Sequence, residues 1–192
     1  MSARRAGDFH VERPVSLGTL VPFAAHRYSP GMPIAIGDPL PDVTVRIMVD
    51  DAPVEVSSRE LLGSGRVVLF AVPGAFTPGC SRVHLPGYAT HAADIAGKGV
   101  DTIACISVND VYVMDAWGQA HDVNATITMI ADGDASFTKA VGLEIEVDRN
   151  ALGLRSQRYA MVLQDGVVTD LLLEDNGLSV ANSAAECVLG RL

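Results

Sequence analysis

One short apolar run constrains the fold of this chain more than any other feature. Residues 66–72 read RVVLFAV, and the turn residues Pro73 and Gly74 follow directly. A strand that is apolar along its whole length has both faces buried, as in a parallel sheet covered by helices on both sides. The run therefore predicts a central strand of an α/β sheet whose carboxyl end opens into a tight loop.

Further strands and helices alternate around this run. Strands are expected at 43–49, 101–108 and 126–130, and helices at 57–62, 78–98, 110–121, 134–142 and 181–192. Two apolar runs also flank Gln164–Asp165–Gly166, the pattern of a hairpin turn with Asp-Gly at its centre. This order predicts an α/β fold, with a central mixed sheet flanked by helices and a terminal antiparallel hairpin.

Composition excludes several classes of protein. The chain has 192 residues, 48% hydrophobic and 19% charged, which is enough to bury a sizeable core. The net charge of −9 argues against nucleic acid or an anionic membrane as a partner. Three cysteines without CxxC or metal-ligand spacing argue against a disulfide framework or a zinc site, and free thiols suit a cytoplasmic location.

Residues 1–31 differ from the rest of the chain. They contain four arginines, no lysine and two acidic residues, and they end in the breaker pair Pro30–Gly31. We interpret them as a flexible N-terminal extension before a domain at 32–192. Two alternatives stay open: a transit peptide for the mitochondrion or plastid, or a misassigned start before Met32.

Cys80 lies where a helix is expected to begin after the buried strand. Free N–H groups and the positive end of the helix dipole favour a thiolate there, ionised and reachable. Thr77 is close enough in a tight turn for its hydroxyl to meet the sulfur, and Pro86 should interrupt the helix after its first turn or two. The competing interpretation is a small buried hydrophobe. A phosphate-binding loop is excluded because Cys80 replaces its lysine and Pro78 lacks an N–H.

The stretch PGAFTPGCS, followed by HLPG, resembles the active-site segment of the peroxiredoxins, in their atypical type II (five-like) branch. It contains the Pro-x-x-x-Thr-x-x-Cys pattern of that family. Three distant blocks agree: CISVND (105–110), DAWGQAH (115–121) and QRYAMVLQDG (157–166). The resemblance implies a thioredoxin-like fold and a thiol-dependent peroxidase that reduces hydrogen peroxide and alkyl hydroperoxides through a cysteine sulfenic acid. It also implies a role in antioxidant defence and cell redox homeostasis, with no metal, haem or flavin.

The resemblance also assigns roles by position. Cys80 would be the peroxidatic cysteine, Thr77 would hydrogen-bond both the sulfur and the peroxide, and Pro73 would shield the sulfenate. Arg158, directly before the aromatic residue of RYAMVL, would stabilise the thiolate and the peroxide oxygens. Arg155 competes for this role, but odd spacing along one strand would place it on the opposite face from Arg158.

Regeneration is expected to need an external thiol. Val180 stands where some relatives carry a resolving cysteine, and both Cys105, in mid-strand, and Cys187, in the last helix, are expected to be structural. A one-cysteine cycle follows, in which glutaredoxin with glutathione, or thioredoxin, reduces Cys80. The resemblance of the region from Asp110 to Trp117 also implies a homodimer.

Other residues receive structural interpretations. His84 is expected to be structural rather than a general base, and Glu174–Asp175 is expected to be a solvated turn. A general thiol–disulfide oxidoreductase would need a CxxC motif, and Val83 occupies the second cysteine position. A redox sensor or holdase, in which Cys80 is oxidised once without turnover, stays open as an alternative.

Overall fold

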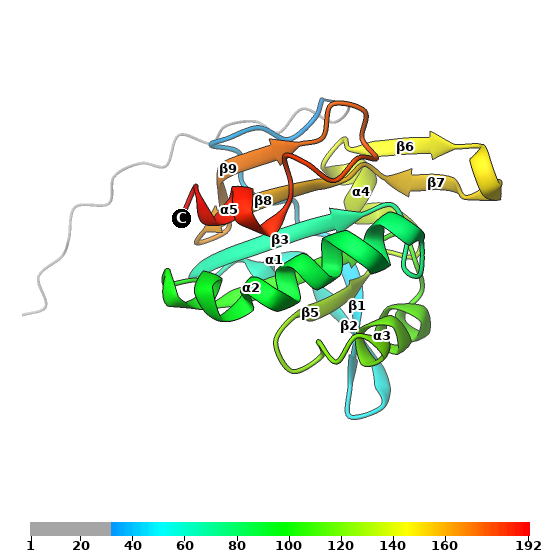
Figure 1. Ribbon diagram of the computed structural model, residues 1–192, viewed down its shortest axis with the longest axis horizontal. Coiled ribbons are helices and arrows are strands. Elements are labelled where there is room, and N and C mark those ends of the chain that lie inside the picture. The colour runs from blue at the N-terminus through cyan, green and yellow to red at the C-terminus, as the bar shows by residue number, and fades with distance from the viewer. Residues whose placement is uncertain (1–31) are drawn as a thin grey trace, which may run out of the picture.

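Seven strands form the central sheet of the computed structural model, which describes residues 32–192 (Figure 1). They lie in the order β2 (Ala52–Ser57), β1 (Thr44–Val49), β5 (Thr128–Ala131), β4 (Thr102–Ser107), β3 (Arg66–Val72), β8 (Tyr159–Gln164) and β9 (Val167–Leu173). Strands β5, β4 and β3 are parallel, and the pairings outside them are antiparallel. The expected extension at 1–31 lies outside the described residues.

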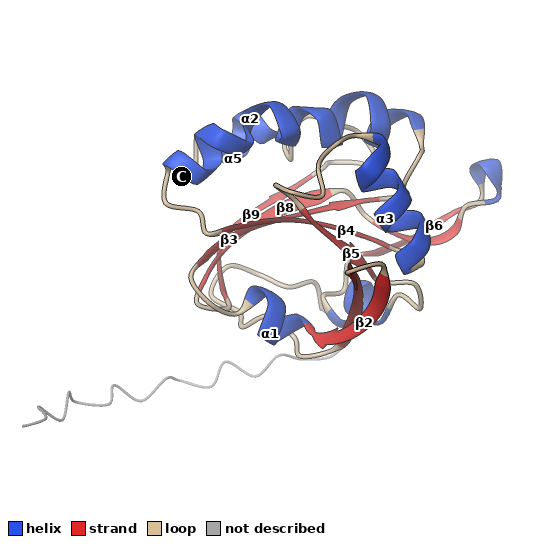
Figure 2. Cartoon of the chain, turned by 90° about the horizontal axis from the view of Figure 1, so that it is seen from below, coloured by secondary structure: helices blue, strands red, loops and turns tan. Residues whose placement is uncertain are grey.

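Helices cover both faces of this sheet. Figure 2 shows α2 (Leu85–Gly97), α3 (Val111–Ala120) and α5 (Ala185–Leu189) over one face, with α1 (Ser58–Leu62) on the other. The short helix α4 (Ser136–Ala140) joins the apolar cluster on the α1 side through Phe137. Within residues 32–192, no helix combines the length and the apolar character needed to cross a membrane. The predicted α/β architecture with helices on both faces is confirmed.

Strand β3 links the two halves of the core. Its even-numbered residues from Val68 to Val72 belong to the cluster under α2 and α3, and its odd-numbered residues from Val67 to Ala71 belong to the opposite cluster. All of them are fully buried, which confirms the central strand predicted from the apolar run. The functional loop begins where this buried strand ends.

The predicted Asp-Gly hairpin is present between β8 and β9. Asp165 and Gly166 have φ values of 49° and 77°, as the two central residues of a type I′ turn require. A second turn of this kind at Asp50 and Asp51, with φ values of 49° and 61°, joins β1 to the unpredicted strand β2. Four of the six β2 residues are exposed and Pro53 weakens the strand pattern, so the short alternation VEVS at 54–57 is a weak signal in the sequence.

Two further differences lie toward the C-terminus. A hairpin of β6 (Glu144–Val147) and β7 (Gly153–Ser156) forms a separate sheet that the sequence does not predict. Its residues are mostly exposed or half-buried, so they carry no core pattern. The last helix is shorter than the expected range 181–192, because the segment after β9 is irregular up to Ala184.

Candidate active site

The loop after β3 is fastened to the end of the neighbouring strand β4. The N–H of Ala75 donates to Asn109 Oδ1 at 2.9 Å, and the Ser107 hydroxyl lies 2.9 Å from the same oxygen. Phe76 has a φ of 59°, a left-handed conformation that is strained for a bulky residue and persists only where surrounding contacts hold it. The anchor at Asn109 therefore helps to hold the loop in one conformation.

Cys80 begins a π-helical turn, Cys80–His84, that leads into α2. The N–H of Leu85 donates to the Cys80 carbonyl, five residues back along the chain. The next residue, Pro86, has no N–H to continue α-helical pairing, so the wider turn forms where the sequence predicts an interruption. Such π turns are frequent at functional sites. Cys80 and His84 are the buried residues of this turn.

A buried arginine contacts the sulfur. Arg158, which is 3% exposed, donates from Nη2 to Cys80 Sγ at 3.2 Å and from Nη1 to His84 Nδ1 at 2.9 Å. Its Nε donates to the Leu178 carbonyl oxygen at 3.1 Å. No carboxylate among residues 32–192 forms an ion pair with this guanidinium. Burial of an uncompensated charge is costly, and the sulfur is the one side-chain partner of Arg158 that can carry a negative charge.

Thr77 and Pro73 lie in the same loop as Cys80. The Thr77 hydroxyl donates to the Gly74 carbonyl oxygen at 2.8 Å, which differs from the expected hydrogen bond between Thr77 and the sulfur. Because the turn directs its only hydroxyl proton to Gly74, the Thr77 oxygen keeps lone pairs that can accept a hydrogen bond from an incoming molecule. Pro73 is buried at the end of β3.

The sulfur is less accessible than the sequence suggests. Cys80 is 0% exposed and belongs to the apolar cluster that contains Phe70 and Leu85. The expected reachable thiol is therefore not present in this conformation, because the π turn points Cys80 toward the core. Cys80 has no exposed surface, so its sulfur is closed off from solvent in this conformation.

His84 holds the guanidinium on its other side. Its Nε2 lies 2.9 Å from the Ser183 carbonyl oxygen and must donate to it, so Nδ1 is left to accept from Arg158. Burial first, and then the positive charge of Arg158, lower the pKa of His84 to about 4. His84 is therefore neutral at neutral pH, in the tautomer that can orient Arg158.

Glu174 is 4% exposed, so the expectation of a solvated turn at Glu174–Asp175 is wrong for this carboxylate. Its Oε1 accepts the Ser183 hydroxyl at 2.6 Å, the Ser183 N–H at 2.8 Å and the Ala181 N–H at 2.9 Å. Burial alone would raise the pKa of Glu174, but these hydrogen bonds outweigh it and lower the pKa to about 2. The stretch Glu-Asp-Asn-Gly is typical of an exposed turn, so no local signal marks the burial of this carboxylate.

Arg155 approaches the loop without contacting the sulfur. It lies in β7, whereas Arg158 lies between β7 and β8, so the argument from alternation along one strand does not apply. Its Nη1 donates to the Val108 carbonyl oxygen at 2.9 Å, and its Nε donates to the Leu152 carbonyl oxygen at 2.8 Å. Arg155 therefore ties β7 to the loop after β4, and Arg158 is the arginine that hydrogen-bonds Cys80.

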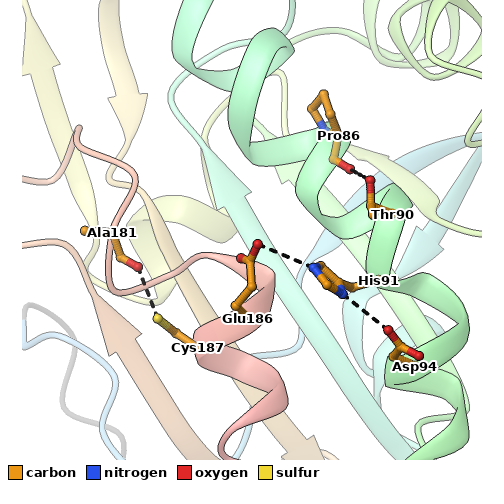
Figure 3. Close-up of polar contacts among 7 residues, drawn as sticks. All are labelled: Pro86, Thr90, His91, Asp94, Ala181, Glu186 and Cys187. Carbon is orange, nitrogen blue, oxygen red and sulfur yellow. Dashed lines mark hydrogen bonds and ion pairs between the residues drawn. The ribbon is translucent and has the colours of Figure 1, made fainter.

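The other two cysteines differ in burial. Cys105 is fully buried in β4, as predicted, and burial followed by the charge of Cys80 raises its pKa well above the ordinary value. Cys187 lies in the last helix as expected, but it is exposed and does not fill the core as a structural cysteine would. Ala185 and Val188 fill the buried side of the short helix, and the Cys187 sulfur donates to the Ala181 carbonyl oxygen at 3.3 Å (Figure 3).

Known proteins include relatives of this chain in both sequence and structure. The Redoxin family model matches residues 35–189. Peroxiredoxin-2B of Arabidopsis thaliana is 42% identical over 79% of this chain and 94% of that protein, and chloroplastic peroxiredoxin-2E of the same plant is 44% identical over 83% and 69%. The crystal structure of reduced Prx3 in complex with H2O2 from Vibrio vulnificus is 50% identical, with a TM-score of 0.78 over 82% of this chain and 98% of that one.

Proposed function

The chain belongs to the peroxiredoxins, antioxidant thiol-dependent peroxidases with a thioredoxin-like fold, and from this premise we propose that Cys80 is its peroxidatic cysteine. The observation that carries the proposal is the 3.2 Å hydrogen bond from the buried Arg158 guanidinium to the Cys80 sulfur. Cys105 is buried in mid-strand and Cys187 lies on α5, and within residues 32–192 neither accepts a hydrogen bond from an arginine.

The proposed reaction begins with attack of the Cys80 thiolate on one oxygen of the hydroperoxide. A sulfur–oxygen bond forms and the oxygen–oxygen bond breaks, so the sulfur is oxidised to a sulfenic acid and the peroxide is reduced. The departing hydroxide or alkoxide takes up a proton from the solvent, which balances the proton that the Cys80 thiol released on ionising, and leaves as water or an alcohol. Negative charge moves from the sulfur to the departing oxygen, along a path that Arg158 can stabilise with its paired N–H groups.

Thr77 and Pro73 would serve the peroxide rather than the sulfur. The Thr77 hydroxyl already donates to Gly74, so its oxygen is free to accept a hydrogen bond from the O–H of a bound hydroperoxide and to align it for attack. Pro73 contributes no N–H at the end of β3 and would shield the sulfenic acid from further oxidation. Hydrogen peroxide and alkyl hydroperoxides are the proposed substrates.

We further propose a one-cysteine cycle, completed by glutaredoxin with glutathione or by thioredoxin. Cys105 is fully buried in the central sheet. Val180, at the position where some relatives carry a resolving cysteine, lies in the loop before α5. After treatment with one equivalent of hydrogen peroxide, dimedone should label Cys80, and a peptide map should contain no disulfide among the three cysteines. Assays with glutathione–glutaredoxin and with thioredoxin would then identify the reductant. A Cys80–Cys105 or Cys80–Cys187 disulfide would contradict the one-cysteine cycle.

A homodimer is proposed through the surface around the active-site loop. Phe76 and Val83 lie on either side of Cys80 in the chain and are 56% and 54% exposed, which is unusual for apolar side chains this large. Phe76→Glu should raise the dimer dissociation constant roughly 10- to 100-fold, since it would bury a charge. Sedimentation velocity measures this, with Ile36→Glu as a matched exposed control. A Phe76→Glu variant as dimeric as the wild type would place the interface elsewhere.

The compartment also belongs to the proposal. We propose the cytoplasm, with a mitochondrial or plastid location as the alternative if residues 1–31 act as a transit peptide. Two relatives are named as chloroplastic, and this chain covers 70% and 69% of their lengths. Fluorescent fusions with and without residues 1–31 would distinguish the two cases, because only a transit peptide changes the location when it is removed.

A further inference from the structure

We propose that Glu174 is a positioning residue for the peroxidase reaction. Its buried carboxylate would hold the segment Gly177–Ser183 in the conformation that sets the Arg158 guanidinium against the Cys80 sulfur. The inference rests on the roles proposed above for Cys80 and Arg158. Glu174 acts at a distance, because its carboxylate hydrogen-bonds the segment and neither of those two side chains.

The segment orients the site through three carbonyl oxygens. The Gly177 carbonyl accepts the backbone N–H of Arg158 at 2.7 Å, and the Leu178 carbonyl accepts Nε of the same residue at 3.1 Å. The Ser183 carbonyl accepts Nε2 of His84 at 2.9 Å and the Tyr88 hydroxyl at 2.8 Å. The first two carbonyls hold Arg158 directly, and the third holds the His84 imidazole, which in turn accepts a hydrogen bond from Arg158. A shift of the segment would therefore move both Arg158 and His84.

The Glu174 carboxylate gathers the 179–183 part of this segment, while Asn176 Oδ1 accepts the N–H groups of Leu178 and Ser179. Residues 174–184 form neither helix nor strand, so their backbone N–H groups need other partners. Oε1 of Glu174 accepts three donors from Ala181 and Ser183, and Oε2 accepts the Ser179 hydroxyl at 3.2 Å. One buried side chain therefore satisfies donors at three positions of the irregular chain, as a carboxylate does at a helix N-terminus.

Because these contacts occupy the Glu174 carboxylate, the Cys80 sulfur stays the hydrogen-bond partner of the Arg158 guanidinium. A carboxylate paired directly with Arg158 would compete with Cys80 for its positive charge. The oxygens of Glu174 are occupied by the segment instead, and Arg158 is left with Cys80, His84 and the Leu178 carbonyl. Glu174 thus supports the geometry without neutralising the cation.

The test measures the second-order rate constant of Cys80 oxidation by hydrogen peroxide, by competition with a haem peroxidase of known rate. Glu174→Ala and Ser183→Ala should each lower it by roughly 10- to 100-fold, because displacing a reacting group by about 1 Å has an effect of this size. Glu174→Gln, whose amide oxygen can replace Oε1, should recover most of the loss. The matched control is Asp175→Ala at the exposed neighbouring position, which should keep the wild-type rate constant.

A double variant separates positioning from a general loss of structure. In an Arg158→Ala background, Glu174→Ala should cause no further decrease, because its effect passes through the missing guanidinium. An equal decrease in both backgrounds would overturn the inference, as would wild-type rate constants in folded Glu174→Ala and Ser183→Ala. If Glu174→Ala does not fold, as judged by circular dichroism, the same cycle with Ser183→Ala decides. If Cys80→Ser still consumed peroxide, the proposed function itself would fail.

Discussion

Cys80→Ser should abolish peroxide consumption, with the turnover rate falling by roughly 10⁴-fold or more to the background of the assay. A serine hydroxyl at neutral pH is neither ionised nor oxidisable to an equivalent of the sulfenic acid, so both the attack and the intermediate are lost. The side chain is almost the same size as cysteine, so the buried site should keep its packing. The assay follows hydrogen peroxide with dithiothreitol as the thiol donor.

The other cysteines supply the controls for this experiment. Cys105→Ser and Cys187→Ser should turn over within about twofold of the wild type, because neither sulfur contacts Arg158. Full activity in Cys80→Ser would refute the assignment of the nucleophile. Loss of turnover in Cys187→Ser, with a normal first oxidation of Cys80, would instead show that the exposed thiol takes part in reduction.

Arg158→Ala should lower the rate constant for oxidation of Cys80 by about 10²- to 10³-fold, the effect of removing a preorganised donor from a developing negative charge. Arg158→Lys should lie between this variant and the wild type. A single ammonium keeps the positive charge but lacks the planar fork that now reaches the Cys80 sulfur and His84 Nδ1 together. Stopped-flow mixing with hydrogen peroxide measures the rate constant directly.

Arg155→Ala is the matched control, since the same side chain is removed from a position that contacts two carbonyl oxygens and no sulfur. Its rate constant should stay within about fivefold of the wild type. If Arg155→Ala were slowed more than Arg158→Ala, the cation that assists the chemistry would have been misidentified. Comparing the two variants with iodoacetamide as well as peroxide would separate stabilisation of the sulfur from cleavage of the oxygen–oxygen bond.

Short sequence patterns predicted the elements whose structure depends on residues close together in the chain. The continuous apolar run predicted β3, Asp165–Gly166 predicted the hairpin turn, and the helix expected at 110–121 corresponds to α3. The exposed strand β2 and the β6–β7 hairpin were missed, because an alternation of only about four residues, such as VEVS in β2 or EIEV in β6, is too short to identify a strand.

The sequence by itself determined the loop and the thiol. Residues 66–80 contain the strand, the Pro-Gly turn, Thr77 and Cys80 in order. This stretch alone therefore places a thiol at the start of a helix. Tertiary structure alone decided which distant groups meet that thiol: Arg158 is 78 residues away along the chain, and Ser183 lies 99 residues from His84. Tertiary structure also buries Glu174, which the sequence predicts to lie in an exposed turn. The reason is that burial and long-range hydrogen bonding depend on how separate segments pack, which local residue preferences do not encode.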